Sequence, residues 1–148
     1  MTLAREAKPS PTLIEEYCKQ YRKLFSDVRN YEAFRDIHIG MLSNEKRKSL
    51  PAIAKIVGLK NHQGLHHFLG KSRWSSGEVG RTRIELLKEA IKGRAIRLIV
   101  DETGDPKKGS KTDYVARQYI GRLGKVENGI VAVVIYGVLE GITFPILF

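Results

Sequence analysis

The chain has 148 residues, of which 26 are Lys or Arg and 16 are Asp or Glu, giving a formal net charge of +10. Apolar residues make up 42% of it, enough for a folded core and too many for a disordered basic tail. Cys18 is the sole cysteine, which excludes an intrachain disulfide and a cysteine-rich zinc site. No apolar run approaches the roughly 18 residues of a membrane span, and residues 1–10 lack the apolar segment of a secretory signal. We therefore expect a reduced, cytoplasmic protein that favours polyanions and makes no membrane contact.

The positive charge is concentrated in the middle of the chain. Residues 43–100 hold 13 basic and 4 acidic residues, a net charge of +9. Residues 1–42, with 7 and 6, contribute +1, and residues 101–148, with 6 and 6, contribute 0. A localised basic block on a folded segment is typical of phosphate binding. A basic surface that serves only solubility is the alternative.

Helical patterns occupy most of the first 92 residues. Apolar residues recur at helical spacing over residues 12–29, where Thr12 and Glu15 fit a capping box at the start. Similar spacing predicts helices over residues 31–41 and 75–92. The apolar spacing therefore predicts that the first 92 residues form a helical region.

Two further short helices are predicted inside the basic block. The first covers residues 50–57 and ends at Gly58, and the second covers residues 62–69. A four-residue turn that begins at Gly58 joins them, which is the outline of a helix-turn-helix. Ala54 is small enough to admit the second helix, and Leu65 is placed to anchor it. The pair is therefore predicted to bind DNA, with a plain helical bundle as the alternative.

The second helix of this pair carries side chains that suit DNA. Amide groups pair with adenine edges in the major groove, and basic groups reach phosphates. The residues predicted to face the bases are Asn61, His62, Gln63, His66 and His67, and those predicted to reach phosphates are Lys60, Lys71 and Arg73. His62 and His66 also have the spacing of zinc ligands, but no further ligand is nearby, so zinc is the less favoured alternative.

After residue 93 the pattern changes to short, apolar, β-branched runs. Strands are predicted over residues 95–100, 128–140 and 142–148, the last interrupted by Pro145. The 27 residues from 101 to 127 are predicted to form a loop, and so long a loop in a compact domain is usually functional. The predicted fold class is α+β, with a helical, basic region over residues 1–92 and a β-rich region over residues 93–148.

Asp101 directly follows the first predicted strand. A carboxylate held by a rigid strand suits a divalent metal, and two metals held by several carboxylates can cleave and join phosphodiesters. If the strand continued, Glu102 would point to the opposite face of the sheet. One carboxylate does not build such a site, and a polar turn that ends the strand is the alternative.

A strong resemblance to DDE-type transposases of bacterial insertion sequences, in the insertion-sequence-701-like group, is carried by LIVDETGDPKKGSKTDYVARQYIGRLGKVENGIVAV. The shared features are the acidic residue Asp101, Thr103-Gly104, a Lys-rich turn at 107–109, Ala-Arg-Gln-Tyr at 116–119 and Gly-Lys-Val-Glu-Asn at 124–128. The stretch from SNEKRKSLPAIAKIVG through LHHFLGKSRW is also similar to that group, so the resemblance covers about residues 30–148.

The resemblance implies a ribonuclease-H-like catalytic domain, of which residues 93–148 would be the first part, and Mg²⁺-dependent cleavage and strand transfer of DNA. It maps the first catalytic and metal-binding acid of the family onto Asp101. It also places near the DNA phosphates the basic residues Lys107, Lys108, Lys111, Arg117, Arg122 and Lys125. The second Asp and the Glu of the family would lie beyond residue 148. We therefore expect an incomplete, inactive fragment that binds Mg²⁺ weakly by itself.

The expected function is DNA transposition, with the double-stranded ends of the element as partner. The missing C-terminal part, or a full-length transposase, is a further expected partner. The resemblance also implies a bacterial, nucleoid-associated location. The alternative function is a stand-alone DNA-binding regulator or inhibitor of transposition.

Overall fold

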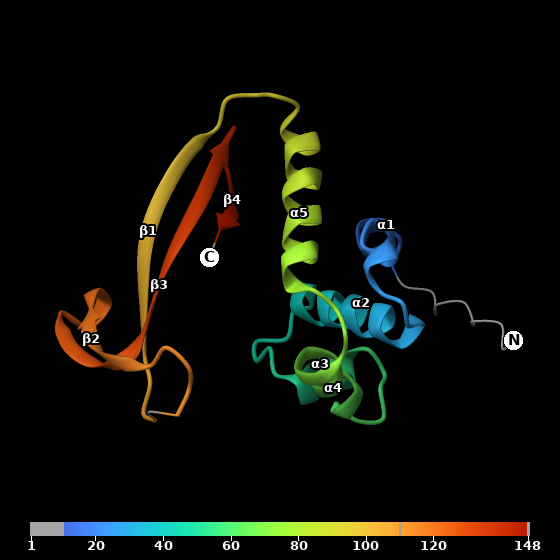
Figure 1. The fold of residues 1–148 in the computed structure, drawn as a ribbon, viewed down its shortest axis with the longest axis horizontal. Helices are drawn as coiled ribbons and strands as arrows, with labels where there is room; N and C mark the ends of the chain where they lie inside the picture. The colour runs from blue at the N-terminus through green and yellow to red at the C-terminus, as the bar shows by residue number, and fades with distance from the viewer. Residues whose placement is uncertain (1–10, 110, 148) are drawn as a thin grey trace, which may run out of the picture. The chain divides into compact units, whose positions relative to one another are not determined.

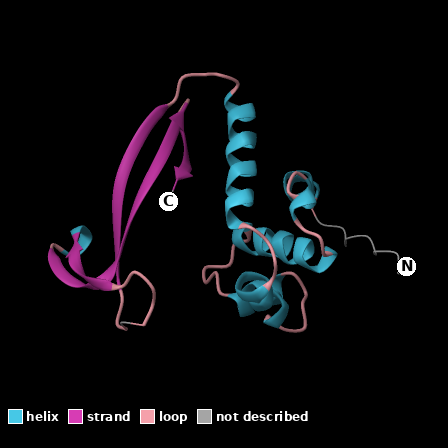
Figure 2. Cartoon of the chain, viewed as in Figure 1, coloured by secondary structure: helices cyan, strands magenta, loops and turns pink. Residues whose placement is uncertain are grey.

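The computed structural model describes residues 11–109 and 111–147, and the predicted absence of a secretory segment falls on residues 1–10, outside them. The described residues form five α-helices and one antiparallel sheet of four strands (Figure 1). Two compact units divide the chain, the first ending at Leu86 and the second beginning at Leu87. All strands follow all α-helices in the chain. Figure 2 shows the helices in cyan and the strands in magenta. The predicted α+β class is confirmed.

The helices are α1 (Thr12–Lys19), α2 (Val28–Leu42), α3 (Leu50–Ile56), α4 (Gln63–Lys71) and α5 (Ser76–Ile91), and the 3-10 turns are η1 (Arg22–Leu24) and η2 (Gly121–Leu123). The prediction of a single helix over residues 12–29 is wrong, because α1 ends at Lys19 and α2 begins at Val28. A new helix begins at Val28 because the Asp27 carboxylate accepts a hydrogen bond from the Arg29 N–H at 2.8 Å and caps α2. The predicted capping box at Thr12 is also wrong, because Pro11 is the N-cap residue and makes no side-chain bond.

The core of the first unit is rich in aromatic rings. Phe25 lies 5.1 Å from Phe34 and 5.9 Å from Phe68, measured between ring centroids. Phe68 in turn stacks on Trp74 at 5.1 Å. Each such pair contributes about 0.5–1.5 kcal/mol beyond the burial of its area. Cys18 is fully buried in this core, and burial raises the pKa of its thiol to about 11, so the thiol stays protonated at neutral pH.

A half-buried ion pair joins α1 to α2. The Arg35 guanidinium is 3% exposed and donates from Nη1 to Glu15 Oε2 at 3.1 Å. The Tyr31 hydroxyl donates to the other oxygen of Glu15 at 3.2 Å. Glu15, predicted to cap its own helix, therefore holds two side chains of the next helix instead.

Strand β3 is the centre of the sheet in the second unit (Figure 1). The strands are β1 (Arg97–Pro106), β2 (Ala116–Ile120), β3 (Lys125–Leu139) and β4 (Ile142–Leu147). β1 pairs along one side of β3, from Arg97 opposite Val138 to Pro106 opposite Gly129. β2 and β4 pair with the two ends of β3 on its other side. All three pairings are antiparallel.

Two predictions for this region are wrong. The strand predicted to end at residue 100 continues to Pro106, and the loop predicted over residues 101–127 contains β2 and the start of β3. Charged residues and glycine are poor strand formers, but pairing along β3 outweighs that local preference. Close packing also contributes, because a Cβ on Gly129 would lie 2.6 Å from Ile120 Cδ1.

Pro145 does not interrupt the last strand. It lies within β4 opposite Tyr136, next to an irregularity in the register between Ile135 and Tyr136. Proline is tolerated at a sheet edge because no ladder bond needs its missing N–H. Phe148, the last residue of the predicted strand, lies outside the described residues.

We predict that Gly40→Ala destabilises the protein. The new Cβ would lie 2.5 Å from Ile53 Cγ2, where α2 touches α3. We expect the free energy of unfolding, measured by urea denaturation, to fall by about 1–3 kcal/mol. The control is Gly80→Ala in α5, where a Cβ meets nothing within 4 Å and alanine stabilises a helix by about 0.5–1 kcal/mol. Equal effects of the two substitutions would contradict the steric argument.

Candidate functional site

Helices α3 and α4 meet at a small buried contact. Ala54 and Leu65 are 2% and 1% exposed. Gly58 has a φ of +72°, which glycine adopts without strain, and it turns the chain between the two helices. The Asn61 side-chain oxygen accepts a hydrogen bond from the Gln63 N–H at 3.0 Å where α4 begins. The predicted pair of helices is confirmed, with bounds that differ by one or two residues.

The side chains predicted to bind DNA are exposed and lie together around α4. Lys60 borders a hollow of about 510 Å³ with His62, and Arg73 borders a groove of about 740 Å³ with Lys71. A third hollow, of about 350 Å³, is lined by the predicted residues of α4 and its N-cap: His62, Gln63, His66, His67 and Lys71. The structure thus gathers basic, imidazole and amide groups on one accessible surface.

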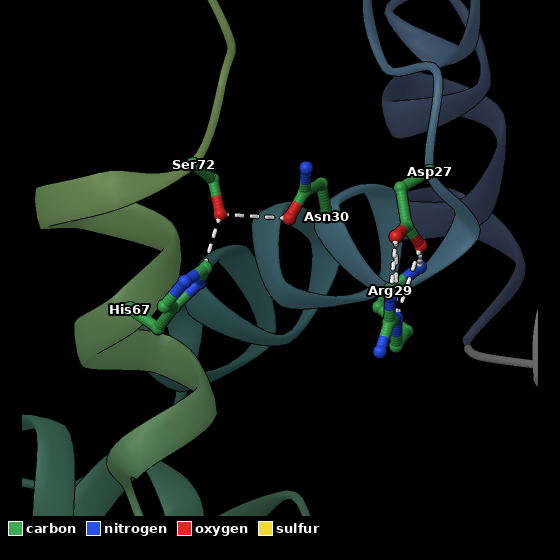
Figure 3. A network of polar contacts seen from close by, with 5 residues as sticks. All are labelled: Asp27, Arg29, Asn30, His67 and Ser72. Carbon is green, nitrogen blue, oxygen red and sulfur yellow. Dashed lines mark hydrogen bonds and ion pairs between the residues drawn. The ribbon is translucent and has the colours of Figure 1, made fainter.

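A polar network crosses the groove between α2 and α4 (Figure 3). The Ser72 hydroxyl donates to Asn30 Oδ1 at 2.9 Å, and its oxygen lies 3.1 Å from His67 Nδ1. On the same groove, Asp27 forms an ion pair with Arg29 at 2.7 Å. The sequence analysis missed this network, since Asn30 and Ser72 are 42 positions apart and no local pattern links them.

Asp101 lies in the middle of β1 rather than at its end. It pairs in register with Val134, and its side chain is exposed. Its Oδ1 accepts a hydrogen bond from the Glu102 N–H at 2.9 Å. Because the strand continues through both residues, Asp101 and Glu102 project to opposite faces of the sheet. The alternative of a strand-ending turn at Asp101 is therefore wrong.

Asp105 shares a face of β1 with Asp101, but roughly 13 Å separates them at the rise of a β-strand. Lys107 and Arg122 both form ion pairs with Asp105, the latter at 3.3 Å. The hydrogen bond from Lys107 lowers the pKa of Asp105 below its usual range. Asp105 is thus bound to cations of its own unit.

A third basic residue of this segment also forms an ion pair with a carboxylate. Lys125 lies 3.0 Å from Glu127, and its hydrogen bond lowers the pKa of that carboxyl group. Of the six basic residues predicted to lie near DNA here, Lys107, Arg122 and Lys125 are therefore ion-paired within the protein. Lys108, Lys111 and Arg117 are exposed.

Asn128 clamps the Lys-rich turn. Its side-chain amide donates to the carbonyl oxygens of Lys107 and Gly109 at 3.0 and 2.9 Å. Its own carbonyl accepts from the Lys107 N–H at 2.9 Å. Three hydrogen bonds from one residue of β3 therefore fix the turn that carries Lys108.

Comparison with known proteins identifies the family. The sequence model described as DDE superfamily endonuclease matches residues 22–148. The chain belongs to this superfamily. It is also 59% identical, over all 148 residues, to a protein of Microchaete diplosiphon described as a probable transposase for insertion sequence element IS701. This chain spans 39% of the length of that relative. No solved structure matches the chain.

Members of this superfamily generally use a divalent metal, and no cluster of candidate ligands is present among the described residues. No three His, Cys, Asp or Glu side chains among them lie close enough together to hold an ion. Asp101 offers one carboxylate, and His62 and His66 gain no further zinc ligand from the described fold. In the same part of the chain, no helix has the length and apolar character that crossing a membrane requires.

We predict that Asn128→Ala loosens the turn after β1. The substitution removes two hydrogen bonds, so cleavage by trypsin after Lys107, Lys108 or Lys111 should accelerate roughly tenfold. Mass spectrometry of timed digests measures the rate at each site. The control is Gln118→Ala, whose amide bonds to the Gly129 carbonyl at 2.7 Å and not to the turn. Equal acceleration in both variants would show that Asn128 has no specific role in holding the turn.

Proposed function

We propose that this chain is the part of an insertion-sequence transposase that binds the DNA ends of the element and supplies the first acid of the catalytic site. The observation that carries the proposal is the exposed surface of α4, where basic and base-reading side chains gather on a helix anchored by the buried Leu65. Membership of the DDE superfamily supports it independently.

In this proposal α3 and α4 act as a helix-turn-helix. Helix α4 enters the major groove of double-stranded DNA, where side chains at its N-terminal end contact base edges. His62, Gln63 and His66 are exposed there and carry groups that pair with bases. Lys60 and Arg73 flank the helix, Lys71 is its last residue, and all three reach phosphates. The net charge of +9 over residues 43–100 agrees with this role.

The sheet is the proposed beginning of a ribonuclease-H-like catalytic domain. Asp101 would hold a Mg²⁺ ion together with acids from outside the described residues. The metal in such a site activates the attacking oxygen and stabilises the leaving one. Asp101 itself contributes a fixed ligand, since it lies in the middle of a paired strand. Lys108 and Lys111 lie in the turn that follows β1. In this proposal they contact DNA phosphates.

Exposed apolar side chains on the sheet support a larger catalytic domain. In the described part of the second unit, Ile120 is the one buried large apolar side chain. Large apolar side chains of β1 and β3 are exposed, among them Leu98, Val100 and Val133. A stable domain generally covers a sheet with a second layer. We propose that sequence corresponding to the rest of the longer relative provides this layer.

A second candidate function is a DNA-binding regulator of transposition. The observation that favours it is the separate core of the first unit, whose buried residues run from Cys18 to Phe68 and include none from the sheet. Such a protein would occupy the element ends without cutting them. DNA binding is common to both functions, whereas a catalytic role of Asp101 belongs to the transposase alone.

We predict that the 148-residue chain binds duplex DNA with a strong dependence on salt. Fluorescence anisotropy with a labelled 30-base-pair duplex, titrated across salt concentrations, should give an affinity that falls steeply as salt rises. Lys71→Gln and Arg73→Gln should each weaken binding on every duplex tested and reduce the salt slope by about one. The control is Lys19→Gln at the end of α1, which removes the same charge away from α4 and should leave the slope unchanged. Equal losses in all three variants would place binding outside α4.

We predict that Asp101 is required for metal-dependent DNA cleavage once the remaining sequence is supplied. The test fuses this chain to the part of the Microchaete relative that it does not cover and measures Mg²⁺-dependent nicking of element-end DNA. Asp101→Asn should abolish nicking, because one metal ligand is lost. Glu102→Gln changes the neighbouring carboxylate on the opposite face and should retain it. Nicking by the Asp101→Asn fusion would show that Asp101 is not part of the catalytic site.

A further inference from the structure

The network of Asn30, Ser72 and His67 determines which ring nitrogen of His67 carries a proton. A serine hydroxyl has one hydrogen to donate. Ser72 donates it to Asn30 Oδ1 at 2.9 Å, the oxygen that faces Ser72 in Figure 3. The 3.1 Å contact between Ser72 Oγ and His67 Nδ1 can then be a hydrogen bond only if Nδ1 carries a hydrogen and donates it.

The other nitrogen of the ring follows from this assignment. In a neutral imidazole one nitrogen donates and the other accepts. With its hydrogen on Nδ1, His67 presents Nε2 as an acceptor. In the described part of the chain, no residue forms a hydrogen bond with Nε2, and His67 is exposed on the hollow that it shares with Gln63 and His66. The acceptor therefore remains available to a ligand at the surface of α4.

We propose that His67 is a base-reading residue that recognises an exocyclic amino group, adenine N6 or cytosine N4, and that Asn30 and Ser72 are its positioning residues. These amino groups are the hydrogen-bond donors that bases present in the major groove. Guanine and thymine present only acceptors there, so the fixed tautomer discriminates against them. The base-reading part of this inference rests on the proposed DNA binding by α4, whereas the tautomer of His67 does not.

The other histidines of the chain provide references for a direct test. His38 Nδ1 lies 2.7 Å from the Phe34 carbonyl oxygen, which can only accept, so His38 must also carry its hydrogen on Nδ1. His62 and His66 are exposed, and in the described part of the chain no hydrogen bond joins either ring to another residue. One protein thus contains the test residue His67, the reference residue His38, whose tautomer follows from its carbonyl partner, and two exposed rings.

The tautomer is measured by long-range ¹H–¹⁵N NMR of the histidine-labelled full chain at pH 8. We expect His67 to show the same Nδ1–H pattern as His38. Ser72→Ala should remove that pattern from His67 and leave it on His38. Asn30→Asp should preserve it, because a carboxylate can only accept the Ser72 hydrogen. An Nε2–H pattern on wild-type His67 would overturn the inference, and so would loss of the Nδ1–H pattern in Asn30→Asp.

Base reading is measured by selection from duplexes with a randomised ten-base-pair centre. Wild-type chain should enrich one position in adenine or cytosine over guanine or thymine, by roughly fivefold or more, through an acceptor contact of this kind. His67→Ala and Ser72→Ala should lose that preference, while Asn30→Asp keeps it. An unchanged preference in Ser72→Ala would overturn the base-reading role.

The two measurements separate this inference from the proposed function. If the chain binds none of the duplexes, DNA binding by α4 and base reading by His67 both fail. The NMR experiment still decides the tautomer in that case. If the chain binds duplexes with the predicted salt slope but enriches no adenine or cytosine position, the proposed function stands and the base-reading role is rejected.

Discussion

The contact between Gly40 of α2 and Ile53 of α3 determines where helices α3 and α4 lie. Gly40 has no room for a methyl group against Ile53, so the two helices approach more closely there than an alanine would allow. The next residue of α3, Ala54, is buried at the joint with α4, where Leu65 is buried too. Consecutive residues of one short helix thus connect α2 to α3 and α3 to α4. The exposed surface of α4 depends on both contacts.

Local patterns in the sequence were sufficient to predict this pair of helices. Ala54, Gly58 and Leu65 lie in one short stretch of the sequence, so their roles can be predicted from that stretch alone. The extent of β1 was not visible in the same way. Its second half contains charged residues and Gly104, which favour loops locally, and it becomes a strand because β3 pairs with it. More than twenty residues separate the paired positions of β1 and β3 in the sequence, so a local pattern does not show the pairing. The same pairing places Asp101 on a rigid segment.

Side-chain contacts between distant segments account for most of what the sequence did not predict. Glu15 fits a capping motif by spacing, yet it binds Arg35 and Tyr31, because Pro11 already occupies the N-cap position. Asp27 is a local exception: it caps α2 by bonding the Arg29 N–H two positions away, and it divides what the periodicity predicts as one long amphipathic helix. The Ser72 bond to Asn30 likewise depends on α2 lying beside the end of α4. Periodicity identifies which residues face inward, but it does not identify the polar partner that a folded neighbour brings.

The distribution of paired charges indicates how the two units divide their roles. In the second unit Asp105 and Glu127 bind three of the basic residues that the sequence placed near DNA. The first unit also carries a net charge of +7, against +3 for the second unit. Salt-dependent affinity scales with the number of phosphates that cations neutralise, so the helical unit should supply most of it.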